Sequence, residues 1–210
     1  MRILKALIGI ACLFVVGLAA AQDLREGRDY TVLSAPQPTE PGKIEVVEFF
    51  SYMCPHCAHF EPVLGPWVKK LPKDVSFQRI PVVFRPQWEA PARLYYALDA
   101  MNEVGRLHGA AFEAIHVEGS NLSTDSAVAE WAAKKGLDAR KFGDVYGSFA
   151  LQSKVMRAKQ ATAAYGISSV PTIVVGGKYR APTETFTGTH EDLLKIVDAL
   201  IAKARREQKR

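Results

Sequence analysis

Cysteine is scarce in this chain: its 210 residues include only Cys12, Cys54 and Cys57. A scaffold held by several disulfides is therefore excluded, and so is a zinc site of four thiolates. His59 could add only one more ligand near the Cys54 and Cys57 pair. A c-type haem site is excluded too, because it needs a histidine directly after the second cysteine, where this chain has Ala58.

The N-terminal apolar stretch, residues 6–18, is shorter than the roughly 20 residues that span a membrane. Arg2 and Lys5 precede it and three alanines, residues 19–21, follow it. This pattern predicts a secretory signal peptide over residues 1–21, cut before Gln22; a retained membrane anchor is the alternative. Cys12 would leave with the signal, so the exported chain would keep one close pair of cysteines. Such a pair is more typical of a protein that exchanges disulfides than of one built from them.

A large excess of one charge is also missing. The formal net charge of +5 falls to +3 without Arg2 and Lys5, and five of the basic residues lie in the segment 203–210 with one acidic residue. Residues 22–201 are therefore close to neutral, which does not favour nucleic-acid binding. The basic tail is most simply the end of a helix, where cations suit the macrodipole, with contact to a membrane surface as the alternative.

The sequence Cys54-Pro55-His56-Cys57 follows a nearly continuous apolar run, residues 44–51. The run predicts a central strand buried on both faces, and the motif predicts the start of a helix. Unpaired N–H groups and the macrodipole stabilise a thiolate at that start, and Pro55 suits the first helical position. We therefore expect Cys54 to be the exposed, activated thiol, Cys57 to face inward as its resolving partner, and His56 to favour the thiolate.

Glu48 interrupts the apolar run just before the motif. A buried carboxylate needs a partner or a raised pKa, so we predict that Glu48 is a proton acceptor for Cys57, with Arg79 as its charge partner. The alternative is a charge on the solvent face of the strand.

Further along, the pattern predicts a leader over 22–43 with a short edge strand near residues 30–33, and a redox helix that Pro62 and Pro66 kink or break in two. A second strand is expected over residues 75–83. From Trp88 to about Tyr165 the periodicity is helical, with one helix running from Asp138 past Phe149.

Strand signals return at residues 173–180, where Gly176-Gly177 predicts a hairpin turn, and a final helix opens near Thr189. His108 and His116 lie among the predicted helices, and we interpret both as packing or surface residues because no other ligand type clusters near them.

The predicted order is strand, redox helix, strand, helices, hairpin and final helix. This order resembles the DsbA family of periplasmic thiol:disulfide interchange proteins, and so do two stretches of sequence: residues 48–51 before the Cys54–Cys57 motif, and residues 166–171 before residues 177–179. The resemblance implies an α/β thioredoxin fold with an inserted all-helical domain. It implies a thioredoxin-like domain over 44–87 and 166–210 and an insertion over 88–165. Pro62, Pro66 and the basic tail are not features of the family.

The resemblance also implies the site. Cys54 would be the nucleophile, Cys57 the resolving thiol, His56 the stabiliser of the Cys54 thiolate and Glu48 the buried acid. Pro171 would follow a cis peptide bond and, with Val170, contact the substrate chain. Apolar residues near the motif, such as Met53 and Phe84, would form a shallow groove. No metal or cofactor is implied.

The implied function is that of a monomeric periplasmic enzyme that donates the Cys54–Cys57 disulfide to reduced, unfolded exported proteins and is reoxidised by a DsbB-type quinone-linked membrane oxidase. Nucleic acid is not among its expected partners. A disulfide isomerase or reductant is the first alternative, although such exported proteins usually have an N-terminal dimerisation domain, for which residues 22–43 are too short. A non-redox peptide-binding holdase is the second.

Overall fold

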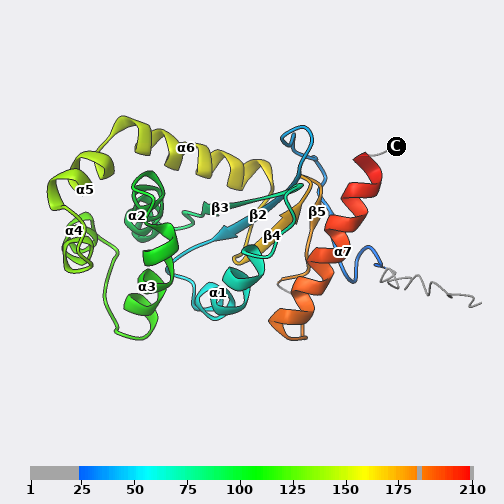
Figure 1. Cartoon of the computed structure of the whole chain (residues 1–210), viewed down its shortest axis with the longest axis horizontal. Coiled ribbons are helices and arrows are strands. Elements are labelled where there is room, and N and C mark those ends of the chain that lie inside the picture. The colour runs from blue at the N-terminus through cyan, green and yellow to red at the C-terminus, as the bar shows by residue number, and fades with distance from the viewer. Residues whose placement is uncertain (1–23, 184–185, 209–210) are drawn as a thin grey trace, which may run out of the picture.

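A computed structural model describes residues 24–183 and 186–208, so the predicted signal peptide lies outside the described residues. The elements in chain order are β1 (Thr31–Val32), β2 (Ile44–Phe50), α1 (Pro55–Val68), β3 (Val75–Pro81), a 3-10 turn (Pro86–Trp88), α2 (Glu89–Ala100), α3 (Val104–His116), α4 (Asp125–Lys134), α5 (Ala139–Tyr146), α6 (Phe149–Ala164), β4 (Thr172–Val175), β5 (Tyr179–Arg180) and α7 (His190–Gln208). Figure 1 shows the sheet between α7 on one side and the helices α2 to α5 on the other.

The five strands form one mixed sheet in the order β1-β5-β4-β2-β3. β2 runs parallel to β3 and antiparallel to β4, with Glu48 opposite Arg79 on one side and Ile173 on the other. Val46 and Val47 of β2 belong to different apolar clusters, one on each face of the sheet. Because successive side chains of a strand point to opposite faces, a strand buried on both faces needs the nearly continuous apolar run that was predicted, which Glu45 and Glu48 interrupt. The arrangement is a thioredoxin fold.

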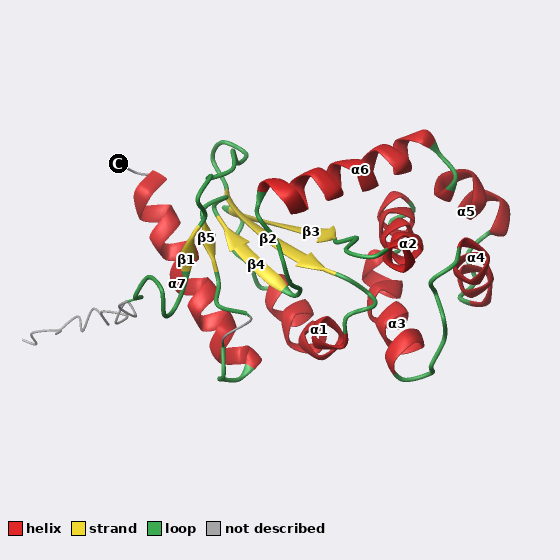
Figure 2. Ribbon diagram, turned by 180° about the vertical axis from the view of Figure 1, so that it is seen from behind, coloured by secondary structure: helices red, strands yellow, loops and turns green. Residues whose placement is uncertain are grey.

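The all-helical insertion, α2 to α6, lies between β3 and β4 in the sequence and at one end of the sheet in Figure 2. Thr124, Asp138 and Ser148 cap α4, α5 and α6 with side-chain oxygens that accept backbone N–H groups. The insertion shares its core with the sheet, since Leu94 and Phe112 belong to the same apolar cluster as Phe49. The insertion and the sheet are therefore packed together, which matters for the site because the two meet beside β2.

Three details differ from the sequence expectations. Of the two outcomes expected for the redox helix, the break is wrong: α1 runs from Pro55 to Val68 with Pro62 and Pro66 inside it, and the burial of Phe60 and Leu64 holds it against the sheet and α7. The second strand ends at Pro81 and not at residue 83. Its partner β2 ends at Phe50, and the Phe50 carbonyl accepts the N–H of Val82 as the last hydrogen bond between the two strands. Phe149 begins a new helix, α6, and is 83% exposed.

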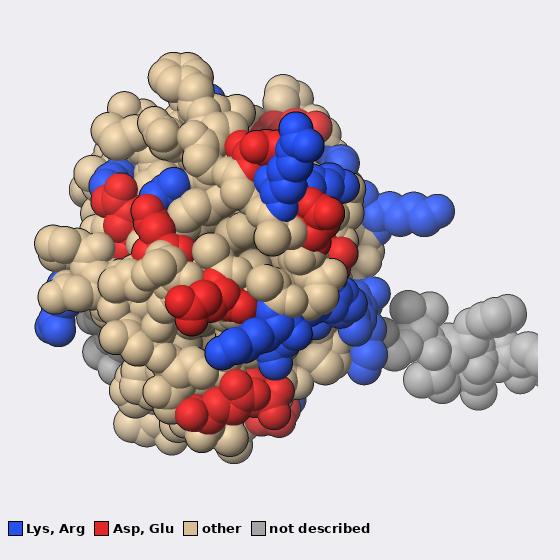
Figure 3. Space-filling view, turned by 90° about the vertical axis from the view of Figure 1, so that its left-hand side faces the viewer, with Lys and Arg blue, Asp and Glu red and all other residues tan. Residues whose placement is uncertain are grey.

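Within the described residues no helix is long and apolar enough to cross a membrane, and no group of three or more His, Cys, Asp or Glu side chains gathers as in a metal site. Figure 3 shows the end of the molecule formed by the helical insertion. Acidic and basic side chains both occur on this face, and a run of basic side chains from its middle to its right-hand edge lies between acidic groups.

Candidate active site

Cys54 occupies the N-cap of α1, and Pro55 is the first residue of the helix, as the sequence predicted. The backbone of Cys54 is extended, with φ −98° and ψ 115°, and its carbonyl accepts the N–H of Ala58 at 3.1 Å. Pro55 has no N–H to leave unpaired there, and the free N–H groups of the first turn point toward the sulfur. No acidic side chain lies in this first turn, so nothing on the helix offsets the positive end of its dipole.

The expectation that Cys54 is exposed is wrong: only 7% of the residue is accessible to solvent, against 1% of Cys57. The reason is the loop before β4, where the peptide bond between Val170 and Pro171 is cis, as the resemblance implied. The carbonyl of Val170 accepts a hydrogen bond from the Cys54 Sγ at 3.3 Å and covers the sulfur. Both cysteines are free thiols in this structure.

Beside Cys54 lies a groove of about 410 Å³. Its lining includes His56 from α1, Val170 and Pro171 from the loop, and His190 and Leu193 from α7. Met53 and Phe84, which the sequence suggested for such a groove, do not line it; the Phe84 ring packs instead near Trp88, with ring centroids 5.6 Å apart. The sequence could not show this because the groove is formed by elements far from the motif along the chain.

The two thiols have opposite proton affinities. A hydrogen bond from the Cys57 thiol lowers the pKa of Cys54 to about 6, with further help from the backbone N–H groups of His56 and Cys57 and from the His56 charge. Burial raises the pKa of Cys57 far above its usual range, and the hydrogen bond to Cys54 and the charge of Glu48 raise it further. At neutral pH the dithiol form therefore holds a thiolate at Cys54 and a thiol at Cys57.

Glu48 is buried, with 2% of its surface exposed, and Arg79 is its partner, as predicted. The Arg79 Nε donates to the Glu48 carboxylate at 2.9 Å, while its Nη2 donates to both oxygens of Glu61 at 3.0 and 2.8 Å. Burial raises the pKa of Glu48 to about 7 in spite of the Arg79 charge, and the Glu61 charge contributes to this rise. Glu48 therefore exchanges a proton near neutral pH.

Glu61 is the charged residue of this site that sequence reasoning missed. It lies on α1 four residues after Cys57, and that spacing places both side chains on one face of the helix. The Nε2 of His108 is 3.4 Å from the Glu61 carboxylate, and the His108 Nδ1 is 2.7 Å from the hydroxyl of Tyr52. His108 is buried and packs at the boundary of the insertion, which agrees with its interpretation as a packing residue.

His116 is the second histidine of the insertion that the sequence drew attention to. Its Nε2 lies 2.8 Å from the backbone carbonyl of Tyr52, two residues before Cys54. The interpretation as a packing residue holds here too. Together with His108 it ties α3 of the insertion to the segment that carries the motif.

The family model described as a DSBA-like thioredoxin domain matches residues 80–195. The thiol:disulfide interchange protein DsbA of Pseudomonas aeruginosa is 44% identical over 210 residues, which cover 99% of this chain and 98% of that protein. The chain belongs to the DsbA family. The DsbA of Azotobacter vinelandii is 42% identical, with 98% of each chain covered.

Solved structures of DsbA proteins agree with this assignment. The crystal structure of Pseudomonas aeruginosa DsbA has a TM-score of 0.85 at 43% identity and covers 90% of this chain and 99% of that one. The oxidoreductase NmDsbA1 of Neisseria meningitidis has a TM-score of 0.80 at 33% identity, with 89% and 97% covered. As a DsbA-family member, the chain is a thiol:disulfide oxidoreductase.

Proposed function

We propose that this protein is a periplasmic dithiol oxidase: it donates a Cys54–Cys57 disulfide to reduced, newly exported proteins. The observation that supports this direction is the contrast between the two thiols, with the pKa of Cys54 lowered to about 6 and that of Cys57 raised. Stabilising the Cys54 thiolate stabilises the reduced enzyme, so the disulfide form gives up its disulfide more readily. The DsbA family is itself a standard example of this relation.

The reaction has two exchange steps. A substrate thiolate attacks the Sγ of Cys54 in the enzyme disulfide, the Cys54–Cys57 bond breaks, and the Cys57 sulfur takes the electron pair and a proton. A second substrate thiolate then attacks the substrate sulfur of the mixed disulfide, and Cys54 leaves as a thiolate. Two electrons pass from two substrate thiols to the enzyme, and the substrate gains one disulfide.

Glu48 and His56 serve the two cysteines separately in this scheme. Glu48, buried behind Cys57, gives a proton to the Cys57 sulfur as it leaves and takes one back when the disulfide re-forms. His56 faces the groove and lowers the pKa of Cys54 through its charge. Neither role requires a metal or another cofactor.

Val170 and Pro171 would hold the substrate. The Val170 carbonyl accepts a hydrogen bond from the Cys54 thiol in this reduced structure. In the disulfide form Cys54 has no S–H to donate, so this carbonyl is left to accept an N–H of a substrate strand, which would bring the substrate's sulfur close to the Cys54 Sγ. The adjoining groove offers apolar surface to the side chains of an unfolded client.

We further infer that the protein acts as a monomer after removal of residues 1–21 and that a DsbB-type quinone-linked oxidase of the membrane reoxidises it. The lowered pKa of Cys54 supports this inference, because reoxidation begins when the Cys54 thiolate attacks a disulfide of the partner.

The test is oxidative refolding of a reduced, unfolded protein that needs two disulfides, with the oxidised enzyme as the only oxidant. We expect one client disulfide per enzyme molecule, complete loss of transfer in Cys54→Ser, and unchanged peptide binding by that variant. Transfer that persists in Cys54→Ser would contradict the proposal, and binding without any transfer by the parent enzyme would favour the holdase.

A further inference from the structure

The strand β3 forms one edge of the sheet, since its only partner among the described strands is β2. In a parallel pair, alternate residues direct both backbone groups to the partner. Asp74 accepts from Ile44 and Val82 donates to Phe50, so the even-numbered residues of β3 face β2. The N–H and C=O groups of Phe77 and Arg79 therefore point away from the sheet, and no backbone bond within the described residues uses them.

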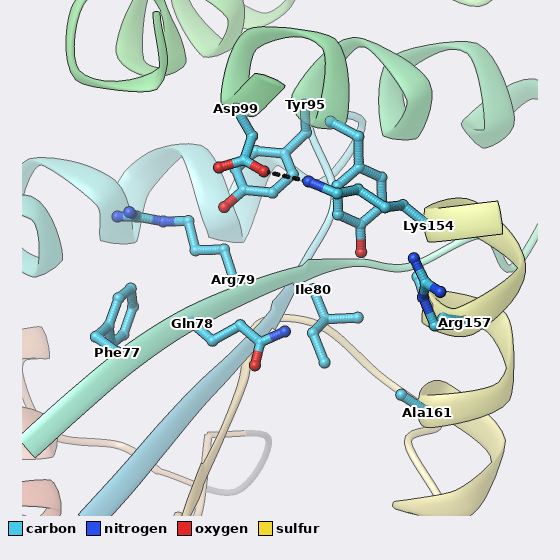
Figure 4. A pocket seen from close by; sticks show the side chains of 11 residues that line it. Phe77, Gln78, Arg79, Ile80, Tyr95, Asp99, Lys154, Arg157 and Ala161 are labelled. Atoms are coloured by element: carbon cyan, nitrogen blue, oxygen red, sulfur yellow. Dashed lines mark hydrogen bonds and ion pairs between the residues drawn. The ribbon is translucent and has the colours of Figure 1, made fainter. Parts of the chain in front are cut away.

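This edge runs along a cavity of about 430 Å³, distinct from the groove beside Cys54. Four successive residues of β3, Phe77 to Ile80, line it, and Figure 4 shows α2 above them and α6 beside them. Ala158 and Ala161 of α6 are small, which leaves room next to the strand. At about 3.3 Å per residue, the stretch of edge that lines the cavity is long enough to pair with a peptide of three or four residues.

One cation in the lining of this cavity has no carboxylate partner. Lys154 is neutralised by Asp99 at 2.7 Å, the pair marked in Figure 4, and the Arg79 guanidinium is held by Glu48 and Glu61. Arg157 is the remaining cation, exposed on α6, and no described carboxylate forms an ion pair with it. An acidic side chain of a bound partner could form an ion pair with Arg157.

We propose that the free edge of β3, between α2 and α6, binds an extended polypeptide segment that carries an acidic side chain, by adding it to the sheet as a further strand. A second copy of this chain is disfavoured as the occupant, because its β3 edge would bring another Arg157 into the same space. The site needs neither cysteine, so it goes beyond the redox function: it would hold a second part of a protein engaged elsewhere on the molecule.

The test uses isotope-labelled, reduced protein and a capped peptide without cysteine, Thr-Val-Thr-Glu-Thr-Val-Thr. We expect saturable amide shifts in nuclear magnetic resonance spectra that are largest at Phe77 and Arg79. Hydrogen exchange of these two amides should slow on binding, while those of Gln78 and Ile80, already directed to β2, should not change. Because the peptide has no thiol, the result is independent of whether the redox proposal holds.

Charge is tested by replacing the peptide's glutamate with glutamine and by Arg157→Gln. Each change should weaken binding by up to about fivefold, the upper end for one solvent-accessible ion pair, and the two together should weaken it no further. Arg140→Gln is the matched control, because Arg140 is also exposed and has no ion pair with a described carboxylate. An equal loss in Arg140→Gln would overturn the assignment to this cavity.

Backbone pairing is tested with two N-methylated peptides, methylated at odd or at even positions. Only the set that faces β3 should lose binding, because alternate N–H groups of an added strand point to the sheet. Shifts centred on Phe186 and His190 would assign the peptide to the groove beside Cys54 instead. Absence of shifts at millimolar peptide, or shifts at β3 that depend on protein concentration alone, would also overturn the proposal.

Discussion

Cys54 and Cys57 lie within one turn of the same helix, yet they occupy different regions of the molecule. Cys54 is at the helix N-terminus beside the groove, where a hydrogen bond from Cys57, the backbone N–H groups and His56 favour its thiolate. Cys57 is inside, packed against the sheet, where burial and the charge of Glu48 favour its thiol. The comparison shows that a three-residue spacing is enough to separate a nucleophile from its resolving partner, because one side chain meets the solvent boundary and the other the core.

Removing either sulfur should have the largest effect, and the two removals should affect disulfide transfer differently. Cys54→Ser should reduce disulfide transfer to the uncatalysed rate, because no accessible sulfur remains. In Cys57→Ser the serine hydroxyl can donate to Cys54 in place of the thiol, so this variant should keep the Cys54 thiolate and its reaction with one disulfide, but stall as a stable mixed disulfide. Gel analysis after acid quenching, with and without reductant, distinguishes the two variants, and equal behaviour would contradict the separate roles.

The raised pKa of Glu48, which lies beside the buried Cys57, can be tested through the pH dependence of the unfolding free energy. Since burial raises the pKa of Glu48 from 4.5 to about 7, the unfolded state binds fewer protons than the folded state between these values, and stability falls as pH rises through them. Glutamine does not titrate, so Glu48→Gln removes this fall in stability. The unfolding free energy of the variant minus that of the parent protein should therefore increase from pH 4 to pH 8 by up to about 3 kcal/mol.

Urea unfolding of the oxidised proteins at both pH values measures this gain. Oxidised protein is used so that neither cysteine titrates. A gain that does not depend on pH would show that Glu48 has an ordinary pKa, and the proton-transfer role would lose its support.

His56→Leu should have the smallest effect, because the His56 charge is one of several influences on Cys54. The pKa of Cys54 should rise, and the reduction potential should fall by about 30 mV or less, which is at most tenfold in the equilibrium constant. Thiolate absorbance in the ultraviolet, titrated on reduced protein, follows the pKa directly. His59→Leu, one turn further along the helix, is the control and should leave the pKa of Cys54 unchanged.

Local signals in the sequence were sufficient for much of the fold. The strand Ile44–Phe50, the start of α1 at Cys54 and the Gly176-Gly177 turn follow from patterns within a few residues, and the structure confirms them. The partnership of Glu48 with Arg79 was also within reach, because parallel neighbours in a sheet share a register.

Features that depend on distant contacts were not predictable in this way. The burial of Cys54 depends on the loop at Val170, more than a hundred residues later, and the link between Glu61 and His108 crosses from α1 to the insertion. Pro62 and Pro66 predicted a kinked or broken helix by local preference, and packing of Phe60 and Leu64 keeps the helix continuous. Tertiary contacts decide these points, and a single sequence does not display them.

The equilibrium reduction potential of the Cys54–Cys57 pair against glutathione tests the central claim most directly. Because the surroundings of Cys54 stabilise its thiolate, the disulfide should be at least about 60 mV more oxidising than that of thioredoxin, which lies near −270 mV. This corresponds to about a hundredfold in the equilibrium constant. A potential close to that of thioredoxin would contradict the account and indicate a reductant.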